Sequence, residues 1–291
     1  MPVLALRIEL SGADPELAER ACLEAGALAI TFSDSRDDAV LEPAVGEVRL
    51  WPATCLQALF EADTDAPSLS ARLASELGLP ARAFKAEELA DRAWEREWLK
   101  DFHALRFGGR LWVCPWHEQV SEPGAVVLRL DPGLAFGTGT HPSTALCLEW
   151  LDAHAPVGLD VIDYGCGSGV LGIAAALLGA QAVDAFDIDP QALLATAENA
   201  AANGVAARLA VRPSAASLAS ACDVLLANIL AGTLCELAAG FAQRVRPGGR
   251  CLLAGILADQ APGVAAAFQP WFDMTESGHR EGWVALTGTR R

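Results

Sequence analysis

Residues 160–189 read DVIDYGCGSGVLGIAAALLGAQAVDAFDID and combine three apolar segments with two turns. Residues 158–165 and 182–189 have the length and apolar character of buried strands, and the glycine-bounded run 169–179 between them predicts a buried helix. A strand, a crossover helix and a second strand in this order predict a pair of parallel strands. The segment therefore places the chain in the α/β class.

The alternation of strands and helices continues to the end of the chain. Asp189 and Pro190 provide the cap and the first residue of a helix that stops at Gly204. Further strands are predicted at 207–213, 222–228 and 251–256, with a turn at 246–250 before the last of them. One further helix is predicted with Leu230 and Phe241 on its apolar face, and another at 258–268. A pair of strands at 270–278 and 282–289 closes the chain. Continuous apolar strands with crossover helices are typical of a parallel sheet that is covered on both faces.

The N-terminal third has a different order of predicted elements. Strands are predicted at 4–10, 27–34, 55–63 and near 81–86, and helices after Asp14 and at 68–78. The order βαββαβ predicts a ferredoxin-like layout. Residues 35–54 show no pattern that assigns them to this layout.

Residues 87–102, EELADRAWEREWLKDF, predict one helix, because Trp94, Trp98 and Phe102 recur at four-residue spacing. We interpret this helix as a packed linker rather than a partner-binding box. RFGGRLWVCP (106–115) then predicts a hairpin or the entry to a strand. The expected divisions are a ferredoxin-like domain 1–86, a helical linker 87–102 and a second domain 103–291.

The composition limits the possible environments and partners. The 291 residues carry 37 acidic against 21 basic side chains, a net charge of −16, which disfavours direct nucleic-acid binding. Arg7 and Glu9 interrupt the N-terminal apolar run, and five glycines interrupt the uncharged run 164–183, so we expect neither a signal peptide nor a membrane span. The eight cysteines form no CxxC pair, which predicts buried free thiols and no metal site. We expect a cytoplasmic protein.

Glycines and polar residues gather at the predicted carboxyl ends of three strands, where ligands bind in such sheets. The first strand runs into Gly165, Gly167 and Gly169, which let the backbone turn sharply and approach a ligand. The second strand ends at Asp187, whose carboxylate can accept both ribose hydroxyls of a nucleoside. The fourth strand ends at Asn228, whose amide offers donors and an acceptor.

The charge around the glycine loop indicates which nucleoside binds. A dinucleotide loop has the spacing GxGxxG, whereas this loop has GxGxG with Asp163 two residues before it. No Lys or Arg lies between Asp163 and Asp187, so a pyrophosphate would meet no cation. A cationic ligand is the better match, and S-adenosylmethionine carries a sulfonium and an amino group.

Each candidate residue also has a structural interpretation. Asp189 is best explained as a helix cap, whereas Asp163 either caps its own loop or, as we favour, belongs to the site. Asn228 can satisfy loop backbone groups, although a functional role is favoured. His141 is more typical of a structural loop histidine than of a catalytic one, and Cys166 has no neighbouring cation that would make it nucleophilic.

Several segments are distinctive as motifs: LDPGLAFGTGTHPST (130–144), VIDYGCGSGVLGIAA (161–175), DIDPQAL (187–193), LLANILAG (225–232) and, upstream, WEREWLKDFHALRFGGRLWVCP (94–115). Together they resemble the bacterial ribosomal protein L-eleven methyltransferases (PrmA-type). The similarity extends from about residue 90 to residue 291. The N-terminal third resembles the family mainly in its layout and in EAGALAITFSD. Ser143 stands where the family often has threonine, and Tyr164 where Phe is commoner.

The resemblance implies a ferredoxin-like substrate-recognition domain, a linker and a Rossmann-like, seven-stranded class I methyltransferase domain. It implies S-adenosylmethionine as the cofactor, with the loop FGTGTH folded over its methionyl end. The resemblance implies cofactor contacts from Thr144, Gly165, Asp187 and Asn228. The glycine-rich loops add Gly167 and Phe136 as predicted contacts.

The activity that the resemblance implies is methylation of the α-amine and lysine side chains of a large-subunit ribosomal protein. The oxygen of Asn228 and the carbonyl of Ile229 would orient the acceptor amine, and we expect a monomer. Three alternatives remain: a methyltransferase for another amine or a small molecule, a nicotinamide-dependent oxidoreductase, and a cofactor-binding module without catalysis.

Overall fold

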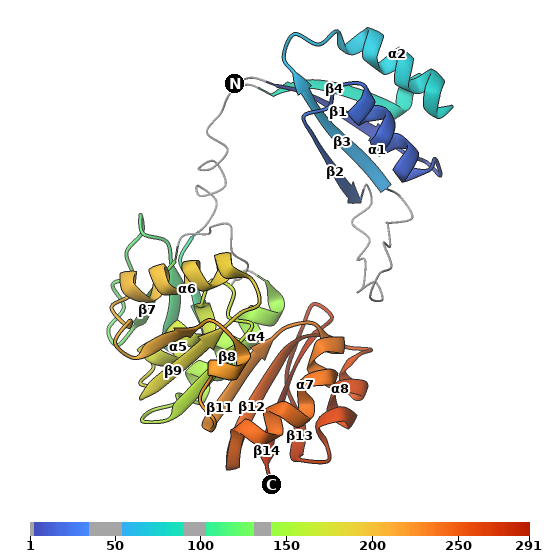
Figure 1. Cartoon of the computed structure of the whole chain (residues 1–291). Helices are drawn as coiled ribbons and strands as arrows, with labels where there is room; N and C mark the ends of the chain where they lie inside the picture. Colours follow the sequence, from blue (N-terminus) through green and yellow to red (C-terminus); the bar gives the residue numbers. More distant parts are fainter. Residues whose placement is uncertain (1–2, 35–53, 90–102, 131–140) are drawn as a thin grey trace. The chain divides into compact units, whose positions relative to one another are not determined.

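The computed structural model describes residues 3–34, 54–89, 103–130 and 141–291. The chain divides into two compact units, Met1–Glu95 and Arg96–Arg291, and each has its own sheet and core (Figure 1). No helix of the described ranges is long and apolar enough to cross a membrane.

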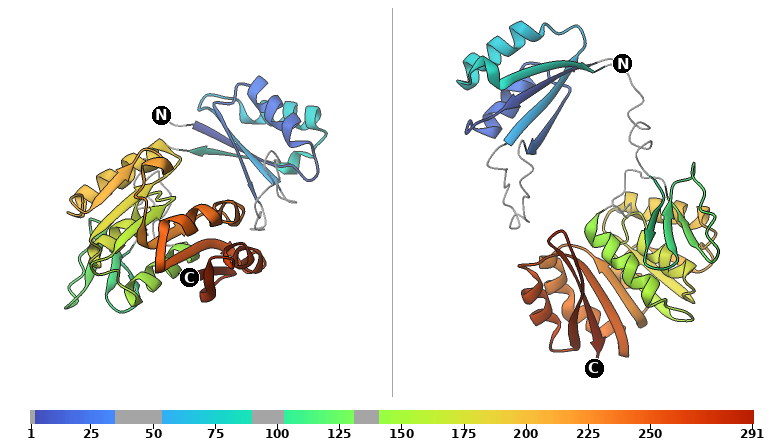
Figure 2. Two further views of the ribbon diagram at one scale, coloured as in Figure 1. Left: turned by 60° about the horizontal axis from the view of Figure 1, so that its bottom comes forward. Right: turned by 180° about the vertical axis from the view of Figure 1, so that it is seen from behind.

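The first unit is a four-stranded antiparallel sheet with two helices on one face (Figure 2). Its elements are β1 (Val3–Glu9), α1 (Pro15–Glu24), β2 (Ala29–Asp34), β3 (Thr54–Glu61), α2 (Ala66–Leu77), the 3-10 turn η1 (Ala81–Ala83) and β4 (Phe84–Leu89). The strand order is β2-β3-β1-β4. Alternate residues of β1, namely Leu4, Leu6 and Ile8, are buried in the core, which also contains Cys22 of α1 and Leu73 of α2.

The second unit contains a seven-stranded mixed sheet and a smaller three-stranded sheet. Its elements are β5 (Leu105–Phe107), β6 (Leu111–Cys114), β7 (Val126–Arg129), α4 (Pro142–Ala153), β8 (Asp160–Tyr164), α5 (Val170–Leu177), β9 (Ala182–Phe186), α6 (Pro190–Ala202), β10 (Leu209–Arg212), η3 (Ala215–Ser217), β11 (Cys222–Asn228), α7 (Ala231–Arg244), β12 (Val245–Leu257), α8 (Ala261–Phe268), β13 (Phe272–Arg280) and β14 (Trp283–Arg290).

The large sheet has the order β10-β9-β8-β11-β12-β14-β13. Strands β8 to β12 pair in parallel, while β14 runs antiparallel to both β12 and β13. Successive strands of the chain therefore extend the sheet to one side of β8, through β9 and β10, and then to the other side, from β11 onward. A crevice forms where the two directions meet, at the carboxyl ends of β8 and β11.

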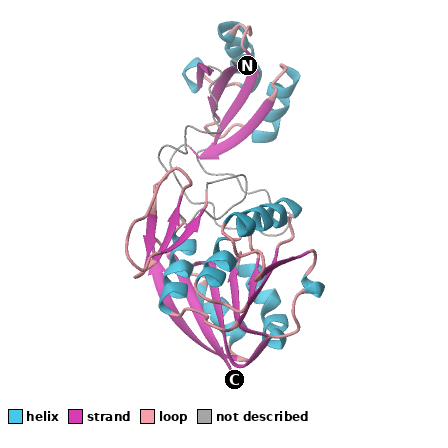
Figure 3. Ribbon diagram, turned by 90° about the vertical axis from the view of Figure 1, so that its left-hand side faces the viewer, coloured by secondary structure: helices cyan, strands magenta, loops and turns pink. Residues whose placement is uncertain are grey.

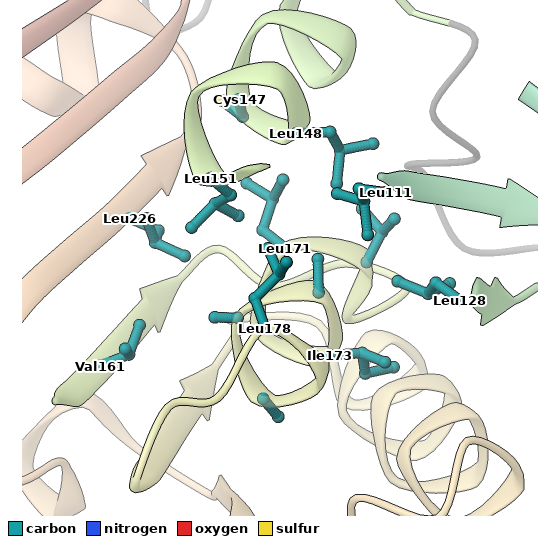
Figure 4. Packing of buried hydrophobic residues seen from close by; sticks show 14 of the residues in the cluster. Leu111, Leu128, Cys147, Leu148, Leu151, Val161, Leu171, Ile173, Leu178 and Leu226 are labelled. Atoms are coloured by element: carbon teal, nitrogen blue, oxygen red, sulfur yellow. The ribbon is translucent and has the colours of Figure 1, made fainter. Parts of the chain in front are cut away.

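Helices cover both faces of this sheet (Figure 3), and the strands divide their side chains between them. Val224 and Leu226 of β11 belong to the core beneath α4 and α5, whereas Leu225 and Ala227 belong to the core beneath α7 and α8. Both faces of β11 are buried, which explains its unbroken apolar sequence. Figure 4 shows the first core, where side chains from α4, α5, β6, β7, β8 and β11 meet.

Caps and hairpins account for several predicted boundaries. Asp14 and Asp189 cap α1 and α6 by accepting the backbone N–H of Glu16 and Gln191. The predicted hairpins form from β5 with β6 and from β13 with β14. None of the eight cysteines, all of which lie in the described ranges, forms a disulfide; seven are buried and Cys235 is exposed.

The structure corrects four boundaries. Residues 87–89 belong to β4 rather than to the linker helix, because they continue the antiparallel pairing with β1, where Leu89 opposes Val3. The predicted turn at 246–250 is an irregularity inside β12, and α8 begins at Ala261 rather than at 258. Leu230 precedes α7 and is 60 % exposed, so it is not part of that helix's buried face. Residues 90–102 lie outside the described ranges, and the linker remains a prediction.

Substitution of Phe241 tests how much the core beneath α7 stabilises the second unit. Its ring is 1 % exposed and meets Tyr164 and Phe268 at centroid distances of 5.0 and 6.3 Å. We expect Phe241→Ala to lower the free energy of unfolding of the second unit by about 3–5 kcal/mol, because it leaves a cavity. Glu236→Ala, at an exposed position of the same helix, should change it by less than about 0.5 kcal/mol. Urea unfolding followed by tryptophan fluorescence measures both, and equal losses would contradict the assignment of Phe241 to the core.

Candidate active site

A cavity of about 400 Å³ lies at the carboxyl ends of β8, β9 and β11. This volume falls within the range of roughly 300–1,000 Å³ that is typical of ligand pockets. Its walls come from the segments that follow these strands, from the start of α4 and from β12 and β14. The lining residues are His141, Ser143, Tyr164, Gly165, Gly167, Phe186, Asp187, Ile188, Asn228, Ile229, Leu230, Thr233, Gly255 and Trp283.

The glycine loop forms the floor of this cavity. Gly165 has a φ of +80°, and a Cβ placed on it would lie 2.3 Å from Cγ2 of Ile229. Any other residue here would adopt a strained backbone and would force the Ile229 side chain to move. Thr196 and Asn199 of α6 donate hydrogen bonds to the carbonyls of Gly167 and Ser168, which fixes the loop from behind.

Asp187 follows the last residue of β9 and lines the cavity, as its position in the sequence predicts. Its Oδ2 accepts the N–H of Gly167 at 2.9 Å, and its Oδ1 accepts the N–H of Asp189 at 3.0 Å. Each carboxylate oxygen can accept a further hydrogen bond, since these bonds use one acceptor position on each. The side chain is partly exposed and can meet a polar ligand.

Asp163 does not belong to the cavity wall, contrary to the interpretation that we favoured from the sequence. It is 1 % exposed, and its Oδ2 accepts the N–H of Gly172 at 2.8 Å, so it satisfies the first turn of α5. Its Oδ1 has no hydrogen-bond partner among the described residues. Burial, opposed by the Gly172 bond and assisted by the charge of Asp187, raises the pKa of Asp163 to about 7.

Asn228 ends β11 and lines the cavity, as predicted. Its Nδ2 donates to Oγ1 of Thr144 at 3.2 Å, across the gap between β11 and α4. Thr144 itself is 1 % exposed and is not among the residues that line the cavity. Phe136, the remaining predicted contact, lies outside the described residues.

The surroundings of His141 and Cys166 favour structural rather than catalytic roles for both residues. Nδ1 of His141 accepts the N–H of Ser143 as the cap of α4, and its ring meets Trp283 edge to face at 4.6 Å. Burial lowers the pKa of His141, although the charge of Glu281 opposes this shift. Burial raises the pKa of the Cys166 thiol to about 12, which removes it as a nucleophile at neutral pH.

The sequence assigned no role at the site to several lining residues, among them Phe186, Ile188, Leu230, Thr233, Gly255 and Trp283. Ile188 is 89 % exposed and lies between two aspartates, and an apolar residue in that position was the one available signal. Trp283 and Gly255 belong to strands far along the chain. Only the sheet order brings them to the cavity.

The cavity suits a ligand that carries positive charge. Among the described residues, the lining includes Asp187 but no lysine or arginine, so a pyrophosphate would lack a cationic partner. The close approach at Gly165 leaves room for a ligand against the backbone, and apolar side chains make up most of the wall. An open α/β sheet with this site characterises a class I methyltransferase, whose methyl donor is S-adenosylmethionine.

Comparison with known proteins gives the family. A model of the family described as Ribosomal protein L11 methyltransferase (PrmA) matches residues 2–291. Two proteins named ribosomal protein L11 methyltransferase are 50 % identical over 293 residues (Pseudomonas aeruginosa strain LESB58; 100 % of this chain, 99 % of the relative) and 52 % identical over 275 residues (Alkalilimnicola ehrlichii; 93 % of each). The crystal structure of a ribosomal protein L11 methylase from Lactobacillus delbrueckii subsp. bulgaricus is 32 % identical and covers 65 % of this chain and 100 % of its own, with a TM-score of 0.60. The chain belongs to the ribosomal protein L11 methyltransferase (PrmA) family.

The buried carboxyl of Asp163 should make stability depend on pH. Because its pKa is raised from 3.8 to about 7, the folded chain keeps a proton there that the unfolded chain loses near pH 4. The stability from this group is present at low pH and is lost as pH rises through about 7. Asp163→Asn carries no charge at any pH, so we expect a flatter melting temperature between pH 5 and 8 and a more stable variant at pH 8.

Differential scanning fluorimetry without added cofactor measures this effect. Asp259→Asn, at an exposed position, is the matched control and should leave the pH slope of the wild type unchanged. An Asp163→Asn variant with the wild-type slope would show that the carboxyl does not carry a raised pKa.

Proposed function

We propose that this chain transfers methyl groups from S-adenosylmethionine to the α-amine and lysine side chains of ribosomal protein L11. The observation that carries the proposal is the cavity at the carboxyl ends of β8, β9 and β11, where Asp187 and Asn228 lie on opposite sides of the glycine loop. The relatives named above are ribosomal protein L11 methyltransferases over nearly their whole length, which supports the same substrate for this chain.

We infer that Asp187, Gly165, Gly167 and Asn228 hold the cofactor, together with Phe136. The carboxylate of Asp187 would accept the ribose hydroxyls, since its two oxygens are each held by one backbone N–H and retain acceptor capacity. The backbone of Gly165 and Gly167 would lie against the nucleoside. When bound, the cofactor supplies an electrophilic methyl group beside the acceptor amine.

Asn228 and Ile229 would orient the acceptor amine. The Nδ2 group of Asn228 is engaged by Thr144, so its Oδ1 and the carbonyl of Ile229 are the acceptors that this segment offers to an amine. An amine must be neutral to react, and an α-amine with a pKa of about 8 meets this condition far more often at pH 7 than a lysine with a pKa of about 10.4. Two acceptors that hold N–H groups aim the lone pair, and orientation of this kind is worth roughly 7–11 kcal/mol in well-aligned reactions.

We propose further that the first unit is a ferredoxin-like substrate-recognition domain that extends through β4 to Leu89, joined by a linker within 90–102 to a Rossmann-like seven-stranded methyltransferase domain (103–291). Residues 1–95 contain 18 acidic and 8 basic residues and so hold much of the chain's net charge of −16. Such a surface favours a basic protein substrate over nucleic acid. The chain would act in the cytoplasm as a monomer.

Incubation with purified ribosomal protein L11 and S-adenosylmethionine tests the function directly. We expect intact-mass measurement to show gains of whole methyl groups on L11. A chain that begins at residue 96 should still bind the cofactor in calorimetry but leave L11 unmodified. If the full chain binds no S-adenosylmethionine, or binds a nicotinamide cofactor more tightly, the proposal is wrong.

The ribose assignment predicts a loss of cofactor affinity. Asp187→Ala should raise the Kd for S-adenosylmethionine at least about tenfold, because two hydrogen bonds to a charged acceptor are lost. Asp189→Ala, two residues away, should leave this Kd unchanged and lower stability by about 1 kcal/mol, because Asp189 only caps α6. Calorimetry at pH 7.5 measures both, and equal affinities would remove Asp187 from the site.

The acceptor assignment predicts a different kinetic pattern. Asn228→Ala should lower kcat for L11 methylation by about tenfold or more while it changes cofactor affinity much less. Steady-state kinetics and calorimetry on the same preparation separate the two quantities. A parallel loss of both would make Asn228 a cofactor-binding residue only.

A further inference from the structure

Thr144 contacts the proposed acceptor-orienting segment rather than the cavity. His141 caps α4 so that the helix begins at Pro142, which places Thr144 in the first turn, facing the end of β11. Its hydroxyl oxygen accepts the Nδ2 hydrogen of Asn228 at 3.2 Å, and the side chain is 1 % exposed. This bond holds the Asn228 side chain in place, with its Oδ1 on the side of Gly255, a residue that lines the cavity.

Gly255 approaches the same segment from the other side. Ala254 pairs with Asn228 across β11 and β12, and Leu253 and Ile256 pair with Leu286 and Val284 of β14. Ala254 and Gly255 thus both oppose the single residue Ala285, which is a β-bulge.

The bulge lets the backbone of β12 pass close to both proposed acceptors. Gly255 has a φ of +77°, and a Cβ placed on it would lie 2.5 Å from the carbonyl oxygen of Ile229 and 3.2 Å from Oδ1 of Asn228. Gly255 also lines the cavity. A side chain here would therefore displace the two oxygens or cover them.

We propose that Thr144 and Gly255 are positioning residues for methyl transfer: the Thr144 hydroxyl holds the Asn228 side chain in place, and the Gly255 bulge keeps Asn228 Oδ1 and the Ile229 carbonyl in place and open to the acceptor. This inference rests on the proposed function. It assigns Thr144 a role on the acceptor side, although the family resemblance implies a cofactor contact for it. The two residues come from α4 and β12, so the acceptor geometry depends on elements other than β11, which carries Asn228.

The first test compares Thr144→Val with Thr144→Ser. Valine keeps the volume of threonine but cannot accept the Asn228 bond, so kcat for L11 methylation should fall about three- to tenfold. The Kd for S-adenosylmethionine should change less than about twofold, and Thr144→Ser should restore kcat to within about twofold of the wild type. Loss of cofactor affinity in proportion to kcat, or an unchanged kcat in the valine variant, would overturn the role of Thr144.

The second test uses two glycines of the same strand. Gly248 has a φ of +79° with nothing within 4 Å of its would-be Cβ, so Gly248→Ala carries the backbone strain of Gly255→Ala without the contact. Gly255→Ala should lose more melting temperature than Gly248→Ala, because it adds the contact to the strain, and only Gly255→Ala should lose kcat, by about a hundredfold if the acceptors shift by about 1 Å. Equal kcat values for the two variants would overturn the role of Gly255.

Measurements on the wild-type protein show whether a negative result contradicts the positioning roles alone or the proposed function as well. If it binds S-adenosylmethionine and methylates L11, while the valine and alanine variants match it in kcat, the positioning roles fail and the function stands. If the wild type itself binds no S-adenosylmethionine or leaves L11 unmodified, the proposed function fails and the positioning roles fail with it.

Discussion

The contact between Gly165 and Ile229 is the constraint on which the site depends. It joins the end of β8 to the end of β11, and these strands are the neighbours from which the sheet extends in opposite directions. With no side chain on Gly165, the turn into α5 lies directly against the segment that follows β11. The cavity then has the glycine loop as its floor, with Asp187 and Asn228 at its two sides. A methyl group at Gly165 would collide with the Ile229 side chain, since its Cβ would lie 2.3 Å from Cγ2 of that residue.

Asp163 connects the glycine loop to α5, although burial of a charged carboxylate is unfavourable. Its carboxyl is buried and accepts the N–H of Gly172, so it connects β8 to the first turn of α5. A buried carboxylate is unfavourable unless it is well paired, which is why the pKa of Asp163 rises to about 7. The positive end of the α5 dipole opposes that cost in part.

The reversed strand β14 and the bulge in β12 give the site its second wall. Antiparallel pairing places Trp283 at the start of β14, beside the carboxyl end of β12, where it lines the cavity and meets His141. The bulge turns Gly255 towards Asn228 and Ile229. Gly165, Gly167 and Asp187 of the proposed cofactor site thus follow β8 and β9, and the residues that position the acceptor come from β11, β12 and α4. Asn228 belongs to both proposed sites.

The sequence by itself determined the α/β class, most strand and helix positions, and the presence of the glycine loop, Asp187 and Asn228 at the site. These features follow from local periodicity, from caps such as Asp189 and from the rule that ligands bind at carboxyl ends of parallel strands. Only the tertiary structure decided that Asp163 faces α5, that Thr144 holds Asn228, and that Gly255 and Trp283 reach the cavity. The direction of a side chain and the meeting of distant strands depend on burial, register and packing across the sheet, and no short stretch of sequence contains that information.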